Sequence, residues 1–289
     1  MRHMCHFFRA MDDGGSNLLV MRHEAWAWAW AWGRRDGVDT FSPDDAAAVA
    51  GWTEVGDQGF LRVVDDVMDP DVNRRVQGMA EAVRAAQIPG VVGVVPAYAS
   101  LLVEWEGAAK ERRAALLRVA RAAERPRGGF PSRVFRVPVL YGGDAGPDLE
   151  EAAERLGLAA AHVVTLHAEN AYRIFCLGFA PGFPLAGPLD ARLVLPRRPS
   201  PRARVPEGSV AMAGAQTGIY PTATPGGWHL IGRTPLRLFG AQRTPPVAWG
   251  PGDVIQFIPI EQEEYHRLRA LPPDHPRSIP SPEAVDAPS

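Results

Sequence analysis

Lysine is almost absent from this sequence of 289 residues: Lys110 is the only one, and the other thirty basic residues are arginine. The phosphate-binding motif G-x-x-x-x-G-K-[ST] therefore does not occur. The glycine-rich stretch Ala213–Pro235, "AGAQTGIYPTATPGGWHLIGRTP", has no lysine nearby that could form a Schiff base. A phosphate bound there has to be held by arginine, by backbone N–H groups or by a partner chain.

Cysteine, net charge and long apolar runs are also scarce. The two cysteines, Cys5 and Cys176, lie far apart, and Cys176 stands in the apolar run "IFCLGF". We expect a buried thiol there and a reducing, cytoplasmic compartment. The net charge of −2 gives no electrostatic reason to bind nucleic acid or an anionic membrane. No run approaches the roughly 20 apolar residues of a membrane span.

The first 140 residues divide into two parts. We expect residues 1–51, which include the repeat "AWAWAWAW", to form a disordered extension, apart from one short helix capped by Ser42. From Trp52 the patterns become regular and predict the order β-α-β-β-α-β, with "RVFRVPVLYG" as the last strand. This is the ferredoxin-like order, so residues 52–140 are predicted to form an N-terminal α+β domain.

Residues 141–270 are predicted to form a helical hairpin followed by a small β-barrel. Two short helices meet at Gly157, and the second has no arginine or lysine that could reach DNA. After Tyr172, short apolar runs alternate with Gly/Pro turns, which is typical of a barrel or a sandwich. We expect the proline-rich residues 271–289 to be a disordered tail.

The glycine-rich stretch also carries polar groups suited to a ligand. Gln216 and Thr217 stand between two glycines, Gly226 and Gly227 follow a proline in a turn, and Tyr220 and Arg233 add a phenol and a guanidinium. Amide, hydroxyl and guanidinium groups suit a carboxylate, phosphate or amide. The alternative is that these groups satisfy one another in tight turns.

Two further features could contribute chemistry. His167 has an ordinary pKa suited to acid–base work, although a single histidine can equally be structural. The segment Leu195–Ser209 places Arg197 and Arg202 among prolines, as an anion-binding edge or as a solvated loop. Carboxylates are few between His167 and Arg233, and no cysteine or histidine pairs show the spacing of metal ligands. We therefore predict no metal site. We expect a partner subunit to supply the acidic groups.

At these residues the sequence resembles a known family. "GFAPGFPLAGPLD", "PRRPSPRARVPEGSVAMAGAQTGIYPTATPGGWHLIGRTPLRLF" and "PPVAWGPGDVIQFIPI" resemble the KipI/PxpB family, also called allophanate hydrolase subunit 1 or carboxyltransferase subdomain C/D. The resemblance runs from about Trp52 to Ile260. It implies an α+β N-terminal domain followed by a cyclophilin-like β-barrel.

The resemblance also implies a function. Family members act with a homologous PxpC-like subunit and a LamB/YcsF-like protein as an ATP-dependent 5-oxoprolinase, with Mg²⁺ in the assembled complex. The matching positions with a catalytic role are then His167, Arg202, Gln216, Thr217, Tyr220 and Arg233, and those that bind the nucleotide are Arg197, Gly226 and Gly227. Two other functions remain open: a non-catalytic inhibitor of a sensor histidine kinase, and a part of a biotin-dependent urea carboxylase/allophanate system.

Overall fold

The computed structural model describes residues 42–125 and 132–283, so most of the expected N-terminal extension lies outside the described residues. The chain divides into two units between residues 48 and 49. Helix α2 (Pro43–Val49) begins as predicted, because the amide of Asp45 donates to Ser42 Oγ at 3.2 Å. The short helix predicted at this position is confirmed.

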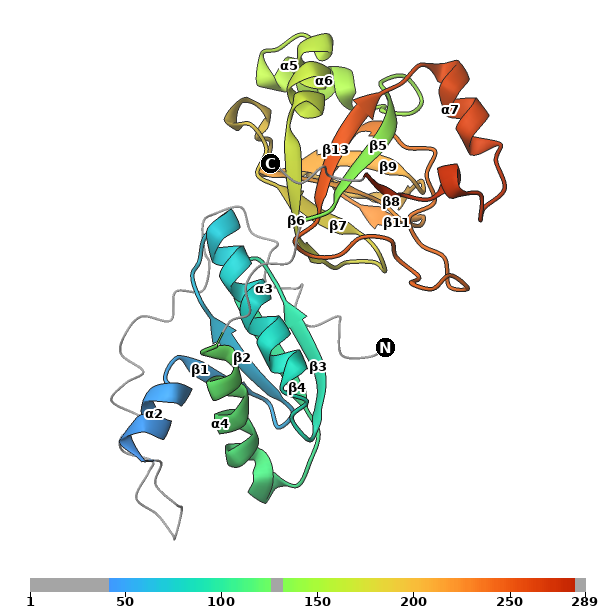
Figure 1. The fold of residues 1–289 in the computed structure, drawn as a ribbon. Helices are drawn as coiled ribbons and strands as arrows, with labels where there is room; N and C mark the ends of the chain where they lie inside the picture. The colour runs from blue at the N-terminus through green and yellow to red at the C-terminus, as the bar shows by residue number, and fades with distance from the viewer. Residues whose placement is uncertain (1–41, 126–131, 284–289) are drawn as a thin grey trace, which may run out of the picture. The chain divides into compact units, whose positions relative to one another are not determined.

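A four-stranded antiparallel sheet follows, in the order β1-β2-β4-β3. Helices α3 and α4 pack on one of its faces (Figure 1) around a core that includes Phe60, Leu101 and Trp105. The N-terminus of α3 is capped by Asp69, which accepts from two backbone amides. The elements are β1 (Trp52–Val55), β2 (Gly59–Val63), α3 (Pro70–Ala85), β3 (Val91–Pro96), β4 (Ser100–Trp105), η2 (Ala109–Glu111) and α4 (Arg112–Ala123).

The predicted ferredoxin-like order is not confirmed. Its last strand, β5 (Val134–Tyr141), lies in the second sheet, where it pairs in parallel with β13 (Val254–Pro259). The edge of the first sheet beside β2 is taken instead by β1, in an antiparallel pair. The segment that we assigned to the end of the N-terminal domain thus belongs to the barrel, because the partner of β5 lies more than a hundred residues later in the chain.

The second sheet closes into a barrel, which confirms the prediction of a barrel domain. Among the described residues, seven strands follow one another in the order β12-β9-β10-β7-β6-β13-β5, and β12 pairs back onto β5. Every residue of β9 is buried. The remaining strands are β6 (Ala171–Leu177), β7 (Pro184–Gly187), β9 (Ser209–Ala213), β10 (Gln216–Ile219) and β12 (His229–Arg233); β8 (Arg202–Val205) and β11 (Thr224–Gly226) form a separate pair.

The predicted helical hairpin is present as α5 (Leu149–Leu156) and α6 (Ala160–Glu169), and Gly157 ends α5 with a φ of 66°. The predicted disorder of the tail is wrong for residues 271–283. Strand β14 (Pro282–Glu283) pairs with β5, and the carbonyl of Ser278 accepts from the Arg237 amide at 2.7 Å. The other elements are η3 (Ala191–Leu193), α7 (Gln262–Arg269) and η4 (Pro276–Ser278). Within the two described ranges, no helix has the length and apolar character needed to cross a bilayer.

Candidate functional site

A buried chain of hydrogen bonds runs through His167, which lies on α6 with no exposed surface. Its Nδ1 lies 2.8 Å from the Tyr141 hydroxyl on β5, and its Nε2 lies 2.8 Å from Thr217 Oγ1 on β10. The Thr217 hydroxyl donates to the carbonyl of Ala211 at 3.1 Å, so it accepts from Nε2–H. Nδ1 is then the acceptor for Tyr141. One threonine proton therefore fixes the tautomer of His167.

Burial holds His167 in its neutral form. The imidazole stacks on Phe257 with ring centroids 4.5 Å apart, and desolvation lowers the pKa of His167 to about 3. A general base for neutral pH needs a pKa near 7 and access to the reacting proton. Thr217 is also fully buried. The structure therefore places both residues in the barrel core, where they order the packing of α6, β5 and β10.

Arg202 is bound by Asp148, a residue that the sequence patterns did not single out. Asp148 precedes α5 with a side chain only 3% exposed, and Arg202 donates to it through Nη1 at 2.8 Å and Nη2 at 2.5 Å. The same carboxylate accepts from the amide of Leu230 at 2.7 Å and from Arg198 at 3.0 Å. The charge of Arg202 is thus already neutralised, so a bound anion would have to compete with Asp148.

The glycine-rich stretch packs around the ring of Tyr220. This ring is 2% exposed and meets Phe183 edge-on at 5.0 Å and Phe179 at 6.0 Å. Burial raises the pKa of the Tyr220 phenol to about 12, so it stays protonated. Phe179 has a φ of 66°, which is rare for a bulky residue, and 46% of its surface is exposed. Phe179 is therefore the member of this aromatic cluster that reaches solvent.

Gly226 and Gly227 differ in the space around them, which gives a matched prediction. A Cβ on Gly226 would lie 2.3 Å from the Tyr220 hydroxyl oxygen, whereas the nearest atom to one on Gly227 is 3.6 Å away. Gly226→Ala should cost about 1–3 kcal/mol because buried Tyr220 cannot move aside freely. Gly227→Ala should leave the melting temperature unchanged. Equal melting temperatures for the two variants would contradict this account.

Two of the predicted arginines have no acidic partner within residues 42–125 and 132–283. Arg197 is exposed, and Arg233 is half-buried at the end of β12. Arg233 Nε is enclosed without a hydrogen bond to the described residues, as is the Oγ of Ser209, its direct neighbour on β9. Uncommitted guanidinium groups are the ones an anion can use. Arg233 and Arg197 are therefore better placed than Arg202 to hold a carboxylate or phosphate.

The remaining predicted residue, Gln216, is half-buried, and its Oε1 accepts from the Tyr98 hydroxyl at 3.0 Å. Cys176 is a free, buried thiol, as predicted, and burial raises its pKa to about 12. Across the part of the chain that the structure describes, no three His, Cys, Asp or Glu side chains are grouped to hold a metal.

Asp148 and Ser209 escaped the sequence analysis for different reasons. Asp148 stands directly before a helix, where aspartate is a common cap, yet its side chain makes no cap bond. Only the fold shows that its carboxylate turns to Arg202 and Leu230. Ser209 begins β9 directly after a Gly/Pro-rich turn and becomes notable only when β12 places Arg233 opposite it. A buried hydroxyl without a partner leaves no signature in the sequence.

Comparison with known proteins gives consistent results. The family model for the carboxyltransferase domain, subdomain C and D, matches residues 51–249. The B subunit of 5-oxoprolinase from Bacillus subtilis (strain 168) is 36% identical over 233 residues, which cover 75% of this chain and 95% of that protein. The B subunit of 5-oxoprolinase from Escherichia coli O157:H7 is 43% identical over 190 residues, 65% of this chain and 86% of that protein.

A solved structure is also similar to this chain in sequence and fold. The crystal structure of TTHA0988 is 39% identical with a TM-score of 0.64, over 70% of this chain and 40% of that one, so this chain spans less than half the length of TTHA0988. The family model alone covers more than half of the chain, and the Bacillus protein is matched almost from end to end. The chain therefore belongs to the KipI/PxpB family, whose members carry the carboxyltransferase subdomains C and D.

Proposed function

We propose that this chain is one component of an ATP-dependent 5-oxoprolinase whose active site is shared with a PxpC-like partner, with a LamB/YcsF-like protein as the third component. One observation carries the proposal: the similarity to the B subunit of 5-oxoprolinase from Bacillus subtilis extends over nearly all of that protein. The uncommitted Arg233 in the glycine-rich stretch supports it, because both 5-oxoproline and ATP are anions.

The reaction explains why ATP is needed. The ring amide of 5-oxoproline resists hydrolysis, and transfer of the γ-phosphoryl group of ATP to the amide oxygen creates a leaving group. Water then adds at the same carbon, and the C–N bond breaks with protonation of the nitrogen, which leaves an acyl phosphate. A second water hydrolyses this acyl phosphate to give glutamate and free phosphate. Arg233 would stabilise the phosphoryl charge. Gln216 and Arg197 lie toward the other end of β9, where Gln216 pairs with Ala213 and Leu195 bridges to Gly214, so they would contact another part of the bound molecules. His167, Thr217 and Tyr220 would shape the wall behind them.

The groups that the barrel residues offer support a shared site. Mg²⁺ prefers carboxylate oxygens, and the one strongly buried carboxylate that the described residues place near these arginines, Asp148, is occupied by Arg202, Arg198 and a backbone amide. The partner subunit would supply the Mg²⁺ ligands and the base that activates water.

The test is ATP hydrolysis that depends on 5-oxoproline, measured with the purified chain, with each partner and with the complete mixture. The chain alone should show no such hydrolysis, because the partner subunit would supply the Mg²⁺ ligands and the base. Only the complete mixture should release phosphate and glutamate in equal amounts. Full activity of the isolated chain would refute the shared site, and no activity in any mixture would refute the function itself.

Arg233→Ala in the complete mixture should lower kcat on the order of a hundredfold, because a guanidinium that meets the charge of the transition state is lost. Arg192→Ala is the matched control, since Arg192 is exposed and pairs with Asp190. A rise in KM with kcat unchanged would mean that Arg233 binds substrate and transition state equally. Unchanged kinetics would remove Arg233 from the mechanism.

A further inference from the structure

The turn between β3 and β4 carries Tyr98, whose hydroxyl donates to Oε1 of Gln216, on β10, at 3.0 Å. This turn is held from α3, because Asn73 is fully buried and its Nδ2 lies 2.9 Å from the carbonyl oxygen of Ala97 and 3.1 Å from that of Tyr98. The same Nδ2 lies 3.1 Å from the carbonyl oxygen of Phe175 on β6. One buried amide thus ties the turn to the barrel, where the rings of Tyr98 and Phe175 pack with centroids 5.5 Å apart.

The hydroxyl of Tyr98 determines which end of the Gln216 amide is free. Burial raises the pKa of Tyr98, so the phenol keeps its proton at neutral pH and can donate it. Because Oε1 accepts this proton, the Nε2 group is the free end, and it forms no hydrogen bond to any residue that the structure describes. Gln216 is only half-buried, so Nε2 can reach a bound molecule. An amide nitrogen donates and does not accept, which suits a carboxylate oxygen.

Arg197 adds a positive charge beside this amide. Burial raises the pKa of Tyr98, and the charge of Arg197 opposes that rise, so the guanidinium lies near the phenol. The segment before Arg197 is fixed to the barrel, because the amide of Gly214 donates to the carbonyl of Leu195 at 2.5 Å. Gln216 and Arg197 therefore share Tyr98 as a neighbour. A donor amide and an exposed guanidinium at one place are suited to an anion.

These groups lie toward the opposite end of β9 from Arg233. Gln216 pairs with Ala213 and Arg233 pairs with Ser209, so the two positions are four residues apart along β9, about 13 Å. A molecule whose reacting oxygen lies near Arg233 therefore presents a different group to Gln216. In 5-oxoproline the carboxylate stands across the ring nitrogen from the amide carbon, so it is the second anionic group that the molecule offers.

We propose that Tyr98 is a positioning residue for Gln216, and that Gln216 Nε2 and Arg197 together bind the carboxylate of 5-oxoproline. This inference rests on the proposed function and adds to it the contacts that select the substrate. The turn between β3 and β4 then takes part in a site that is otherwise built on the barrel. A lactam without a carboxylate, such as 2-pyrrolidinone, would keep the contacts of its amide and lose those to Gln216 and Arg197.

The first test is steady-state kinetics of Tyr98→Phe in the complete mixture of subunits. The variant keeps the ring that packs on Phe175 and removes the donor. It should raise the KM for 5-oxoproline about tenfold and leave kcat and the KM for ATP unchanged, because a ground-state contact to the carboxylate is weakened. Gln216→Leu should raise the same KM at least as much. The double variant should be no worse than Gln216→Leu, because the Tyr98 hydroxyl acts through Gln216.

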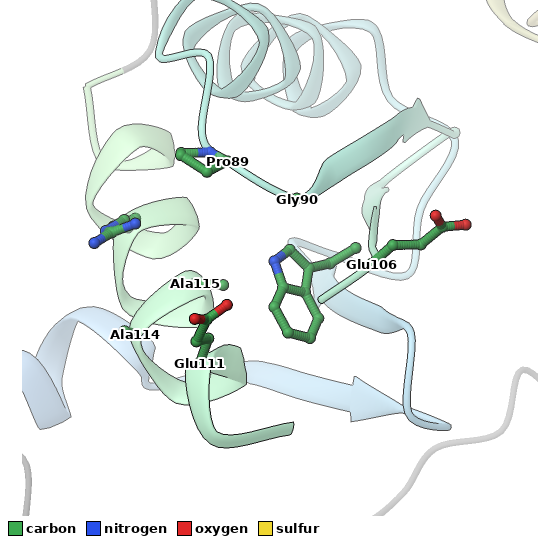
Figure 2. A pocket seen from close by; sticks show the side chains of 8 residues that line it. Pro89, Gly90, Glu106, Glu111, Ala114 and Ala115 are labelled. Atoms are coloured by element: carbon green, nitrogen blue, oxygen red, sulfur yellow. The ribbon is translucent and has the colours of Figure 1, made fainter. Parts of the chain in front are cut away.

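Two control variants leave this arrangement intact. Tyr265→Phe removes a phenol hydroxyl on α7, where the ring contacts His266. Arg118→Gln removes a charge beside the first sheet, where Arg118 lines a cavity of about 300 Å³ next to Trp105 and helix α4 (Figure 2). The residues that line this cavity include neither Tyr98 nor any residue of the barrel. Both controls should keep kcat and both KM values of the unchanged protein.

A second measurement needs no activity. In the full chain labelled with ¹⁵N-glutamine, the Nε2 signals of Gln216 are those lost in Gln216→Leu. They should shift in Tyr98→Phe, and in the unchanged chain 5-oxoproline should move them whereas 2-pyrrolidinone should not. Signals that stay in place in both experiments would overturn the proposal, as would a Tyr98→Phe variant in which kcat and both KM values change together. If no mixture of subunits turns over 5-oxoproline, the proposed function fails, and the Gln216 signals still decide this inference.

Discussion

Asp148→Asn is expected to lower the free energy of unfolding by about 3 kcal/mol. The change removes the carboxylate that holds two arginines and the amide of Leu230. Breaking a buried ion pair on one side leaves the partner charges uncompensated, which costs about 3–5 kcal/mol. The lower end applies because Arg198 and Arg202 are 23% and 28% exposed and regain some hydration.

The control for Asp148→Asn is Glu151→Gln. Glu151 also binds Arg198, at 2.7 Å, but its side chain is 48% exposed. Arg198 lowers the pKa of Glu151 through this hydrogen bond, yet water screens the pair. Urea unfolding of the two variants should therefore show a clear loss for Asp148→Asn and no measurable change for Glu151→Gln. Similar losses would mean that burial of Asp148 does not set its importance.

The second large effect concerns acid. His167 has its pKa lowered to about 3 in the folded chain, against 6.5 for an unperturbed histidine, and desolvation is the cause. Between these values the unfolded chain binds a proton that the folded chain refuses. The contribution of His167 to stability is therefore complete above pH 6.5 and is lost as the pH falls toward 3. The slope is about 1.4 kcal/mol per pH unit, so about 3 kcal/mol is lost by pH 4.

His167→Gln tests this linkage. The variant should be less stable at pH 7, because the bonds to Tyr141 and Thr217 are disturbed, but its stability should fall less steeply between pH 6.5 and 4. His162→Gln, an exposed position on the same helix, should keep the steep fall. The measurement is the free energy of urea unfolding at each pH. Parallel pH profiles for all three proteins would contradict a buried neutral His167.

Local patterns predicted most elements but not their partners. The alternation in "SLLVEWE" and the face formed by Val76, Ala80 and Val83 depend on neighbours a few residues away, and the structure contains β4 and α3 there. The apolar run of β5 is equally clear, but a strand's sequence does not say which sheet it will join. The proline-rich composition of residues 271–283 led to a prediction of disorder that is wrong. Two residues of β14 suffice to pair with β5, and so short a strand leaves no pattern in the sequence.

The sequence predicted which residues belong to the candidate site. It did not predict which of them have partners or are buried in the fold. The glycine-rich stretch does surround buried polar and aromatic groups, as its composition indicated. Arg202 and Arg233 look alike in the sequence, whereas the fold gives a carboxylate partner to the first alone among the described residues. That partner, Asp148, precedes Arg202 by 54 residues. Burial likewise makes His167 unsuited to acid–base catalysis. This burial arises from the folded barrel as a whole, so the residues next to His167 in the sequence do not reveal it.

The pairing of β5 with both β12 and β13 has a consequence for synthesis on the ribosome. The first sheet and its helices are complete once α4 has emerged, whereas β5 emerges next and finds none of its strand partners. Its edges stay unpaired until β12 and then β13 leave the ribosome, and exposed strand edges favour association between chains. A pause in translation before His229 therefore holds the nascent chain with both edges of β5 unpaired.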